Sequence, residues 1–132
     1  MRLEITPYYA AILALLFIVL SVRTIKTRRE HKIAIGDGGE KSILRASRVH
    51  ANFSEYVPFT LLLIGMVELL SYSPLIVHAL GIILVFARLS HAYGVSQTNE
   101  NFKFRIFGTA TTINIIGVCA FLILIKPFFT LG

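Results

Sequence analysis

The chain has 132 residues, of which 55% are hydrophobic and 15% are charged, and its formal net charge at pH 7 is +6. A soluble domain of this length buries too small a share of its surface to hide so many apolar side chains. The composition therefore excludes an ordinary soluble domain and indicates an integral membrane protein. Because the basic residues cluster near helix ends, it also argues against a nucleic-acid surface.

The length suits a single domain over residues 1–132, because a membrane-spanning helix takes roughly 20 residues and short loops complete the rest. We predict an all-α integral membrane four-helix bundle, with helices at about residues 6–29, 41–70, 74–95 and 102–125. The first apolar run lacks a signal-peptide cleavage site, so we expect it to remain as a span.

The first and second predicted helices are joined by a loop that contains Gly36-Asp37-Gly38-Gly39. Glycine adopts positive φ without strain, so we expect this stretch to be a tight turn. Phosphate binding is the alternative, but the dinucleotide and P-loop fingerprints need other glycine spacings and a preceding strand.

Three further features are expected to be structural. Cys119 lies in the fourth apolar run, so no disulfide can form within one chain and we expect a buried thiol. Glu68, near the end of the second helix, is expected to be an interfacial carboxylate that faces headgroups. No metal site is predicted, because His50, His78 and His91 share no common helix face and no Cys/His ligand spacing appears.

The distribution of basic residues predicts the orientation in the membrane. The first and third connections are basic, whereas the second carries no Lys or Arg. We therefore expect both termini outside the cytoplasm and both basic loops inside it. The residues counted are Arg23, Lys26, Arg28, Arg29, Lys32, Lys41 and Arg45 for the first connection and Lys103 and Arg105 for the third.

A polar stretch opens the second predicted helix. At about 100° per residue, Arg48, Asn52 and Glu55 share one face, with Tyr56 beside them. Ionisable side chains at the mouth of a membrane-spanning helix indicate a functional site, because hydrocarbon penalises each of them by a few kcal/mol. A polar contact between helices that binds no ligand is the alternative.

The third helix ends on the same side of the membrane and carries Arg88 and His91 on one face. With Arg105 and the basic residues behind it, including Arg28, these side chains form a cationic cluster around one carboxylate, Glu55. Arginines bind carboxylates, a carboxylate binds an amine, and a cation beside a thiol favours the thiolate. Glutathione, with two carboxylates, an amine and a thiol, fits this cluster. The alternatives are an Arg88–Glu55 pair and a His91 that only packs.

The spacing of these residues resembles that of a known family. The relevant stretches are Arg48-x-x-x-Asn52-x-x-Glu55-Tyr56-x-Pro58 and Phe86-Ala87-Arg88-Leu89-x-His91. They resemble the MAPEG superfamily of membrane-associated proteins in eicosanoid and glutathione metabolism. The resemblance is to its small bacterial members, which are similar to microsomal glutathione transferases and have the Gly-Asp-Gly-Gly loop. It covers essentially the whole chain.

The resemblance implies a homotrimer of four-helix protomers in the bacterial inner membrane. Glutathione would be the co-substrate, bound in a bent form between neighbouring subunits near the cytoplasmic side, with no metal. A lipophilic small-molecule substrate would reach the site from the membrane lipid.

The same resemblance implies the roles of the site residues. The expected glutathione-binding residues are Arg48, Asn52, Glu55, Tyr56, Arg88, His91 and, from the basic segment behind them, Arg28. Arg105 matches the arginine that stabilises the thiolate and is the expected catalytic residue, with Lys103 as its rival. The chain departs from the family where two branches have a second tyrosine in the third helix, because Val95 stands there and Tyr93 is displaced by two positions.

The expected activity is that of a membrane-bound glutathione transferase, also with peroxidase activity, toward lipophilic electrophiles. A non-catalytic lipid- or glutathione-binding scaffold is the alternative, which the missing tyrosine favours, because the five-lipoxygenase-activating branch of the superfamily is a binding protein. A small transporter or channel subunit is a third hypothesis, suggested by the charges within the membrane alone.

Overall fold

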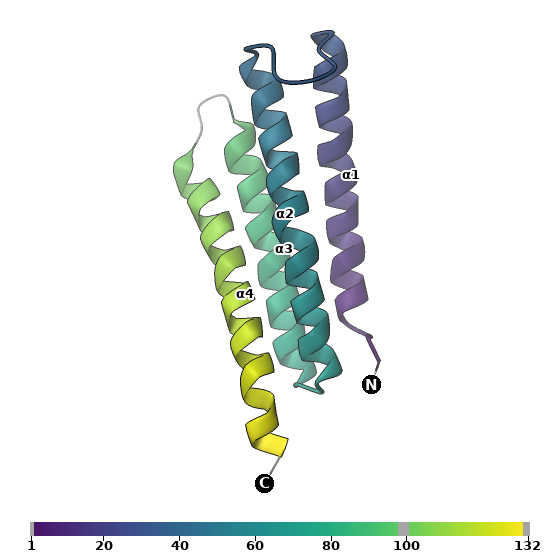
Figure 1. Cartoon of the computed structure of the whole chain (residues 1–132), viewed down its shortest axis with the longest axis vertical. Coiled ribbons are helices and arrows are strands. Elements are labelled where there is room, and N and C mark those ends of the chain that lie inside the picture. The colour runs from purple at the N-terminus through teal and green to yellow at the C-terminus, as the bar shows by residue number, and fades with distance from the viewer. Residues whose placement is uncertain (1, 98–100, 131–132) are drawn as a thin grey trace.

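The computed structural model describes residues 2–97 and 101–130, which form four helices. These are α1 (Thr6–Glu30), α2 (Lys41–Leu69), α3 (Pro74–Ser96) and α4 (Phe102–Thr130). The helices run alternately up and down, so the N-terminal and C-terminal ends of the chain lie at the same end of the molecule (Figure 1). At the other end lie the α1–α2 loop, the last turn of α3 and the first turn of α4 (Figure 1). We refer to this second end as the loop end.

The helix bounds lie within one residue of those predicted, except at the end of α4. The sequence predicted an end at about residue 125, before Pro127, but the helix continues to Thr130. Proline lacks one backbone N–H, so it removes only the hydrogen bond to the carbonyl four residues earlier and permits the next turn to form. Residues 98–100, within the predicted surface loop before α4, lie outside the described residues.

α2 and α3 form the centre of the bundle. They contact each other, and each contacts both outer helices, whereas α1 and α4 do not contact one another within the described residues. Figure 1 shows α1 and α4 on opposite flanks. The arrangement confirms an all-α bundle, in which the central pair has neighbours on two sides.

Three of the described helices, α1, α3 and α4, are long and apolar enough to cross a membrane. Their outward surfaces carry many exposed large apolar side chains, which suits contact with lipid. α2 was also expected to span, but it is not among the three, because the polar residues of its first half lower its mean apolarity. The chain is an integral membrane bundle whose central helix α2 carries polar residues through its first half.

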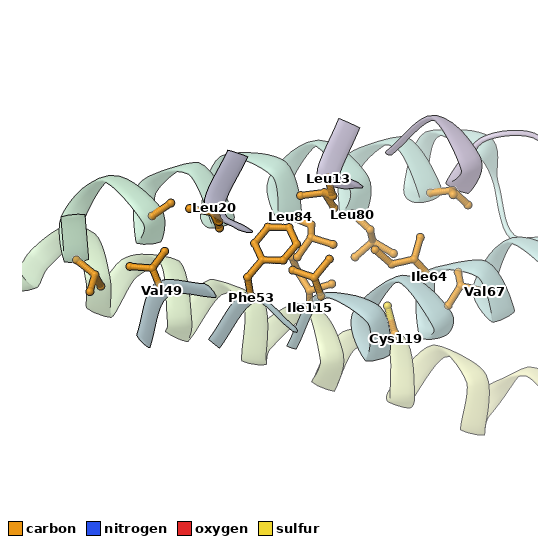
Figure 2. Packing of buried hydrophobic residues seen from close by; sticks show 14 residues of the cluster. Leu13, Leu20, Val49, Phe53, Ile64, Val67, Leu80, Leu84, Ile115 and Cys119 are labelled. Carbon is orange, nitrogen blue, oxygen red and sulfur yellow. The ribbon is translucent and has the colours of Figure 1, made fainter. Parts of the chain in front are cut away.

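The apolar core lies between the helices and includes residues from Val49 to Val67 of α2 and from Val77 to Val95 of α3, part of which Figure 2 shows. Leu13 from α1, Phe53 from α2, Leu84 from α3 and Ile115 from α4 meet in it, and all are nearly fully buried. Cys119 packs in the same cluster with no exposed surface, which confirms the predicted buried thiol.

At the end that carries the termini, Glu68 caps the first turn of α1. Its Oε1 accepts hydrogen bonds from the backbone nitrogens of Glu4 and Ile5, each at 2.6 Å, and its Oε2 binds Thr6. The first N–H groups of a helix have no partner within that helix, and a carboxylate satisfies both the donors and the helix dipole. Glu68 therefore binds another helix, where the sequence had predicted contact with headgroups.

At the loop end, two arginines from other helices hold the last turn of α3. Arg23 of α1 donates through Nη1 to the Ser96 hydroxyl and through Nη2 to the Ser96 carbonyl at 3.5 Å. Arg45 of α2 donates to the carbonyl of Val95 at 3.3 Å. Cations at a helix C-terminus complement its dipole and its unpaired carbonyls. These contacts position the end of α3 against α1 and α2.

The α1–α2 loop folds around Arg28. Its Nη1 donates to the carbonyls of Gly36 at 2.7 Å and Ala34 at 3.3 Å, and its Nη2 donates to the Ser47 hydroxyl at 3.2 Å. Gly36, Gly38 and Gly39 all have positive φ, which confirms the predicted tight turn.

Candidate functional site

A pocket of about 500 Å³ opens between α2, α3 and α4 near the loop end. All three helices contribute side chains to its wall. They are Leu44, Arg45, Arg48 and Asn52 from α2, His91 and Val95 from α3, and Arg105, Ile106, Thr109, Ala110 and Ile113 from α4. Since three helices converge here, the pocket depends on the tertiary fold and on no single segment.

Four of the residues predicted for the site line this pocket. Arg48 and Asn52 come from the polar face of α2, His91 from α3 and Arg105 from the first turn of α4. The helical spacing that placed Arg48 and Asn52 on one face, and the topology that brings the two helix ends together, explain why they converge. The structure thus brings together residues from three separate helices.

A third arginine, Arg45, also lines the pocket, although it was not among the predicted site residues. Arg45 is three residues before Arg48 and seven before Asn52, so the same helical spacing that grouped those two also includes it. It lines the pocket and at the same time donates to the Val95 carbonyl. This double contact ties the pocket wall to the end of α3.

The pocket changes character along its length. Its arginines lie toward the loop end, while Thr109, Ala110 and Ile113 line the part next to α4 farther from that end. At 1.5 Å per residue, Ile113 lies about 12 Å farther along α4 than Arg105. One end of the pocket is therefore cationic and the other apolar, which suits a polar anionic molecule that meets an apolar one.

Arg88 lies directly behind the pocket wall. Its side chain is only 1% exposed, and its Nη2 donates to Asn52 Oδ1 at 2.7 Å and lies 3.5 Å from His91 Nδ1. Its guanidinium carbon lies 5.6 Å from the centre of the Phe53 ring, within the range of a cation–π contact. Arg88 thus contacts two pocket residues without lining the pocket itself.

Comparison with known proteins identifies the family. The sequence profile of the MAPEG family matches residues 6–125, which include every helix residue of the pocket wall. The chain belongs to the MAPEG family. It is also 32% identical to the inner membrane protein YecN of Escherichia coli K12, over 108 residues that cover 82% of this chain and 81% of YecN. YecN of Escherichia coli O6:H1 matches with the same identity and coverage.

Membership of MAPEG makes the chain a membrane protein of the superfamily concerned with glutathione and eicosanoid metabolism. It confirms the resemblance that the Arg48 to Pro58 spacing suggested.

Besides Arg88, three more of the predicted binding residues do not line the pocket. Glu55 is exposed on the surface of α2, one turn beyond Asn52, and Tyr56 is half-buried beside it. Arg28 lies in the last turn of α1, where its hydrogen bonds hold the α1–α2 loop together. The alternative Arg88–Glu55 pair is replaced by the Arg88–Asn52 hydrogen bond, and among the described residues no carboxylate forms an ion pair with Arg88.

The structure distinguishes between residues that the sequence left as alternatives for the same role. Arg105 lines the pocket, whereas its rival Lys103 is exposed and does not. Val95 lines the pocket at the position where two MAPEG branches have tyrosine. Tyr93 is exposed and packs edge-on against Phe104, with ring centres 5.4 Å apart, so it lies away from the pocket as its displaced position predicted.

A glycine allows α4 to approach α3 closely beside the pocket. A Cβ atom on Gly108 would lie 2.5 Å from the Ala87 carbonyl oxygen and 2.6 Å from the Cβ of His91. Only a residue without a side chain fits this distance, and small residues at helix contacts are typical of membrane bundles. Gly108 is one turn from Arg105, so this close packing sets how far Arg105 stands from His91.

Proposed function

We propose that this MAPEG chain is a membrane-bound glutathione transferase that acts on lipophilic electrophiles. The observation that supports the proposal is the composition of the pocket, with Arg45, Arg48 and Arg105 at one end and an apolar wall at the other. Arginine binds carboxylates in a bidentate manner, and glutathione carries two of them. The apolar end suits the second substrate, which enters from the lipid.

The binding roles follow from the chemistry of each side chain. Arg48, with Arg45, binds the carboxylates, while Asn52 and His91 hold polar groups of the peptide. The ammonium group of glutathione needs an anionic partner, and Glu55 is the nearest carboxylate along the polar face of α2. Because Glu55 is exposed, it reaches the peptide where protomers meet, which agrees with the homotrimer that the family resemblance implies.

Arg105 is assigned to the chemical step. A guanidinium beside the glutathione thiol favours the thiolate, which is the nucleophile. The thiolate sulfur then forms a bond to the electrophilic carbon, and the leaving group departs with its bonding electrons. For a nitroaryl chloride the products are the thioether and chloride, and the thiol proton goes to solvent. Arg105 remains charged throughout because arginine does not lose its proton in proteins.

The site is assigned to the cytoplasmic side of the inner membrane. Both basic connections belong to the loop end, and basic loops remain in the cytoplasm. Glutathione would then reach the pocket from the cytoplasm. The relative YecN is named as an inner membrane protein, which supports the same membrane for this chain.

The test is conjugation of a dinitroaryl chloride with glutathione by the purified protein in detergent or nanodiscs. We expect turnover by the parent protein and a loss of about 100-fold in kcat for Arg105→Ala, the scale for removing one group that stabilises a developing charge. The matched control is Lys103→Ala, which removes an exposed cation two residues away and should leave kcat within about twofold. Equal rates for Arg105→Ala and the parent would remove Arg105 from the chemical step.

A non-catalytic glutathione- or lipid-binding protein is the second candidate, favoured by Val95 at the tyrosine position. Without a tyrosine, one hydroxyl that could close over the ligand is missing. Calorimetry distinguishes the two candidates: glutathione binding without turnover of any of several electrophiles would identify a binding protein.

A further inference from the structure

Arg88 is the largest side chain among those that are fully buried. Burial of a cation is costly unless charges or hydrogen bonds compensate it. Within the described part of the chain, Arg88 Nε and Nη1 are buried without a hydrogen-bond partner. The hydrogen bonds of the guanidinium are made by Nη2. Those contacts go to Asn52 and His91, which both line the pocket. The polar contacts of the Arg88 side chain are therefore made with residues of the pocket wall.

The Arg88 contact determines how the Asn52 amide is turned. A guanidinium has five N–H donors and no acceptor, so only the amide oxygen of asparagine can receive its hydrogen bond. The 2.7 Å distance from Arg88 Nη2 to Asn52 Oδ1 is that of a strong, charge-assisted bond. Because the amide oxygen of Asn52 is bound to Arg88, its NH2 group is left for other partners, and this group can only donate hydrogen bonds.

The same reasoning applies to His91. Its Nδ1 lies 3.5 Å from Arg88 Nη2, and a donor-only neighbour requires an unprotonated nitrogen at that position. In the neutral ring the proton must then lie on Nε2. Asn52 and His91 thus both become donors on the side away from Arg88.

We infer that Arg88 is a positioning residue that fixes the Asn52 amide and the His91 tautomer, so that the pocket wall presents hydrogen-bond donors and selects an anionic, acceptor-rich ligand group. Arg45, Arg48 and Arg105 add only donors to the same wall. Identification of that ligand as glutathione rests on the proposed function, whereas the orientation of the two side chains does not.

The first experiment measures the His91 tautomer by nitrogen-15 NMR of histidine-labelled protein in detergent. The chain has four histidines, and His91→Gln identifies the resonance to follow. At a pH where the ring is neutral, we expect the Nε2–H tautomer in the parent protein and a mixture of tautomers in Arg88→Met. An Nδ1–H tautomer in the parent, or an unchanged spectrum in a folded Arg88→Met, would overturn the inference.

The second experiment uses Asn52→Asp, which keeps the shape of the side chain and gives Arg88 a carboxylate to pair with. We expect the thermal unfolding temperature to rise, because the buried cation gains a counter-charge. We expect the dissociation constant for glutathione to increase by about tenfold or more, because the pocket loses an amide donor and gains an anion. A role in packing alone would raise stability and leave binding unchanged, so that result would contradict the inference.

The matched control is Asn101→Asp, the same chemical change at an exposed residue before α4. Asn101 Oδ1 accepts from the Lys103 backbone nitrogen at 3.1 Å, which aspartate can also do. Neither stability nor glutathione affinity should change in this variant. If the parent protein binds no glutathione, the proposed function fails, but the tautomer measurement still decides whether Arg88 sets the polarity of the wall.

Discussion

Glu68 and Thr6 are joined by a pair of hydrogen bonds that link the end of α2 to the start of α1. Glu68 Oε2 accepts from the backbone nitrogen of Thr6 at 2.8 Å and from its hydroxyl at 2.5 Å. Threonine side chains commonly cap their own helix, but here the hydroxyl donates to a carboxylate of another helix, and that carboxylate takes over the capping role. The first turn of α1 thus depends on a residue more than 60 positions away.

Replacing Glu68 by glutamine should destabilise the protein by about 1–2 kcal/mol, the range for loss of a helix cap. Glutamine keeps one oxygen acceptor, but its amide nitrogen cannot accept from the α1 backbone, and the charge that complements the helix dipole is lost. Thermal unfolding in detergent measures the change. Glu4→Gln is the control, because that side chain is exposed at the same end. Equal unfolding temperatures for the two variants would contradict the capping role.

Gly108→Ala should destabilise the bundle by about 1–3 kcal/mol, as overpacking of a tight contact does. The new methyl would meet the Ala87 carbonyl and His91, so α4 must move away from α3 and carry Arg105 with it. We therefore expect weaker glutathione binding together with a lower unfolding temperature.

Gly117→Ala provides the comparison for Gly108→Ala. It lies in the same helix, but a Cβ there would meet nothing within 4 Å. Alanine is also the better helix former, so this variant should unfold at the same or a higher temperature. If both glycine variants behave alike, close packing at Gly108 does not set the distance between α3 and α4.

Arg28→Gln should loosen the α1–α2 loop. The substitution removes the donors to Ala34, Gly36 and Ser47, and glutamine is too short and has too few donors to replace them. Hydrogen exchange of the amides in residues 32–40 should become faster by about tenfold, the change that corresponds to roughly 1.4 kcal/mol of lost protection.

The Arg28→Gln variant also distinguishes a role of Arg28 in holding the loop from a role in binding glutathione. Arg29→Gln is the control, since Arg29 is exposed next to it. Loop exchange that rises in Arg28→Gln with an unchanged glutathione affinity assigns Arg28 to the loop. A fall in affinity with unchanged exchange would assign it to the ligand, as the sequence predicted.

The helices could be predicted closely from the sequence because three of them are long apolar runs bounded by polar residues, glycines or Pro74, and the second continues a polar stretch into an apolar run. The convergence of Arg48, Asn52, His91 and Arg105 was also predictable, since helical spacing groups side chains on a face and short connections bring helix ends together. Both inferences use local periodicity, which a single sequence displays directly.

Other contacts could not be predicted because they depend on side-chain positions across helices. Asn52 and Glu55 share a face, so spacing alone cannot say which of them Arg88 contacts, and the structure selects Asn52. The partner of Glu68 is distant in the chain and consists mostly of backbone N–H groups, which have no sequence signature. Arg45, by contrast, could have been found from its spacing to Arg48.

The polar contacts at the two ends of α1 fix its position along the bundle. Thr6 is held by Glu68 at one end of α1, and Arg23 holds Ser96 at the other. The separation of 17 positions from Thr6 to Arg23 spans about 26 Å of helix, close to the roughly 30 Å thickness of the hydrocarbon. Lipid supplies no hydrophobic driving force between helices, so interhelical hydrogen bonds such as these contribute to holding them in register. A slide of α1 by one residue would break both contacts together, so the two ends fix the lengthwise position of α1 against α2 and α3.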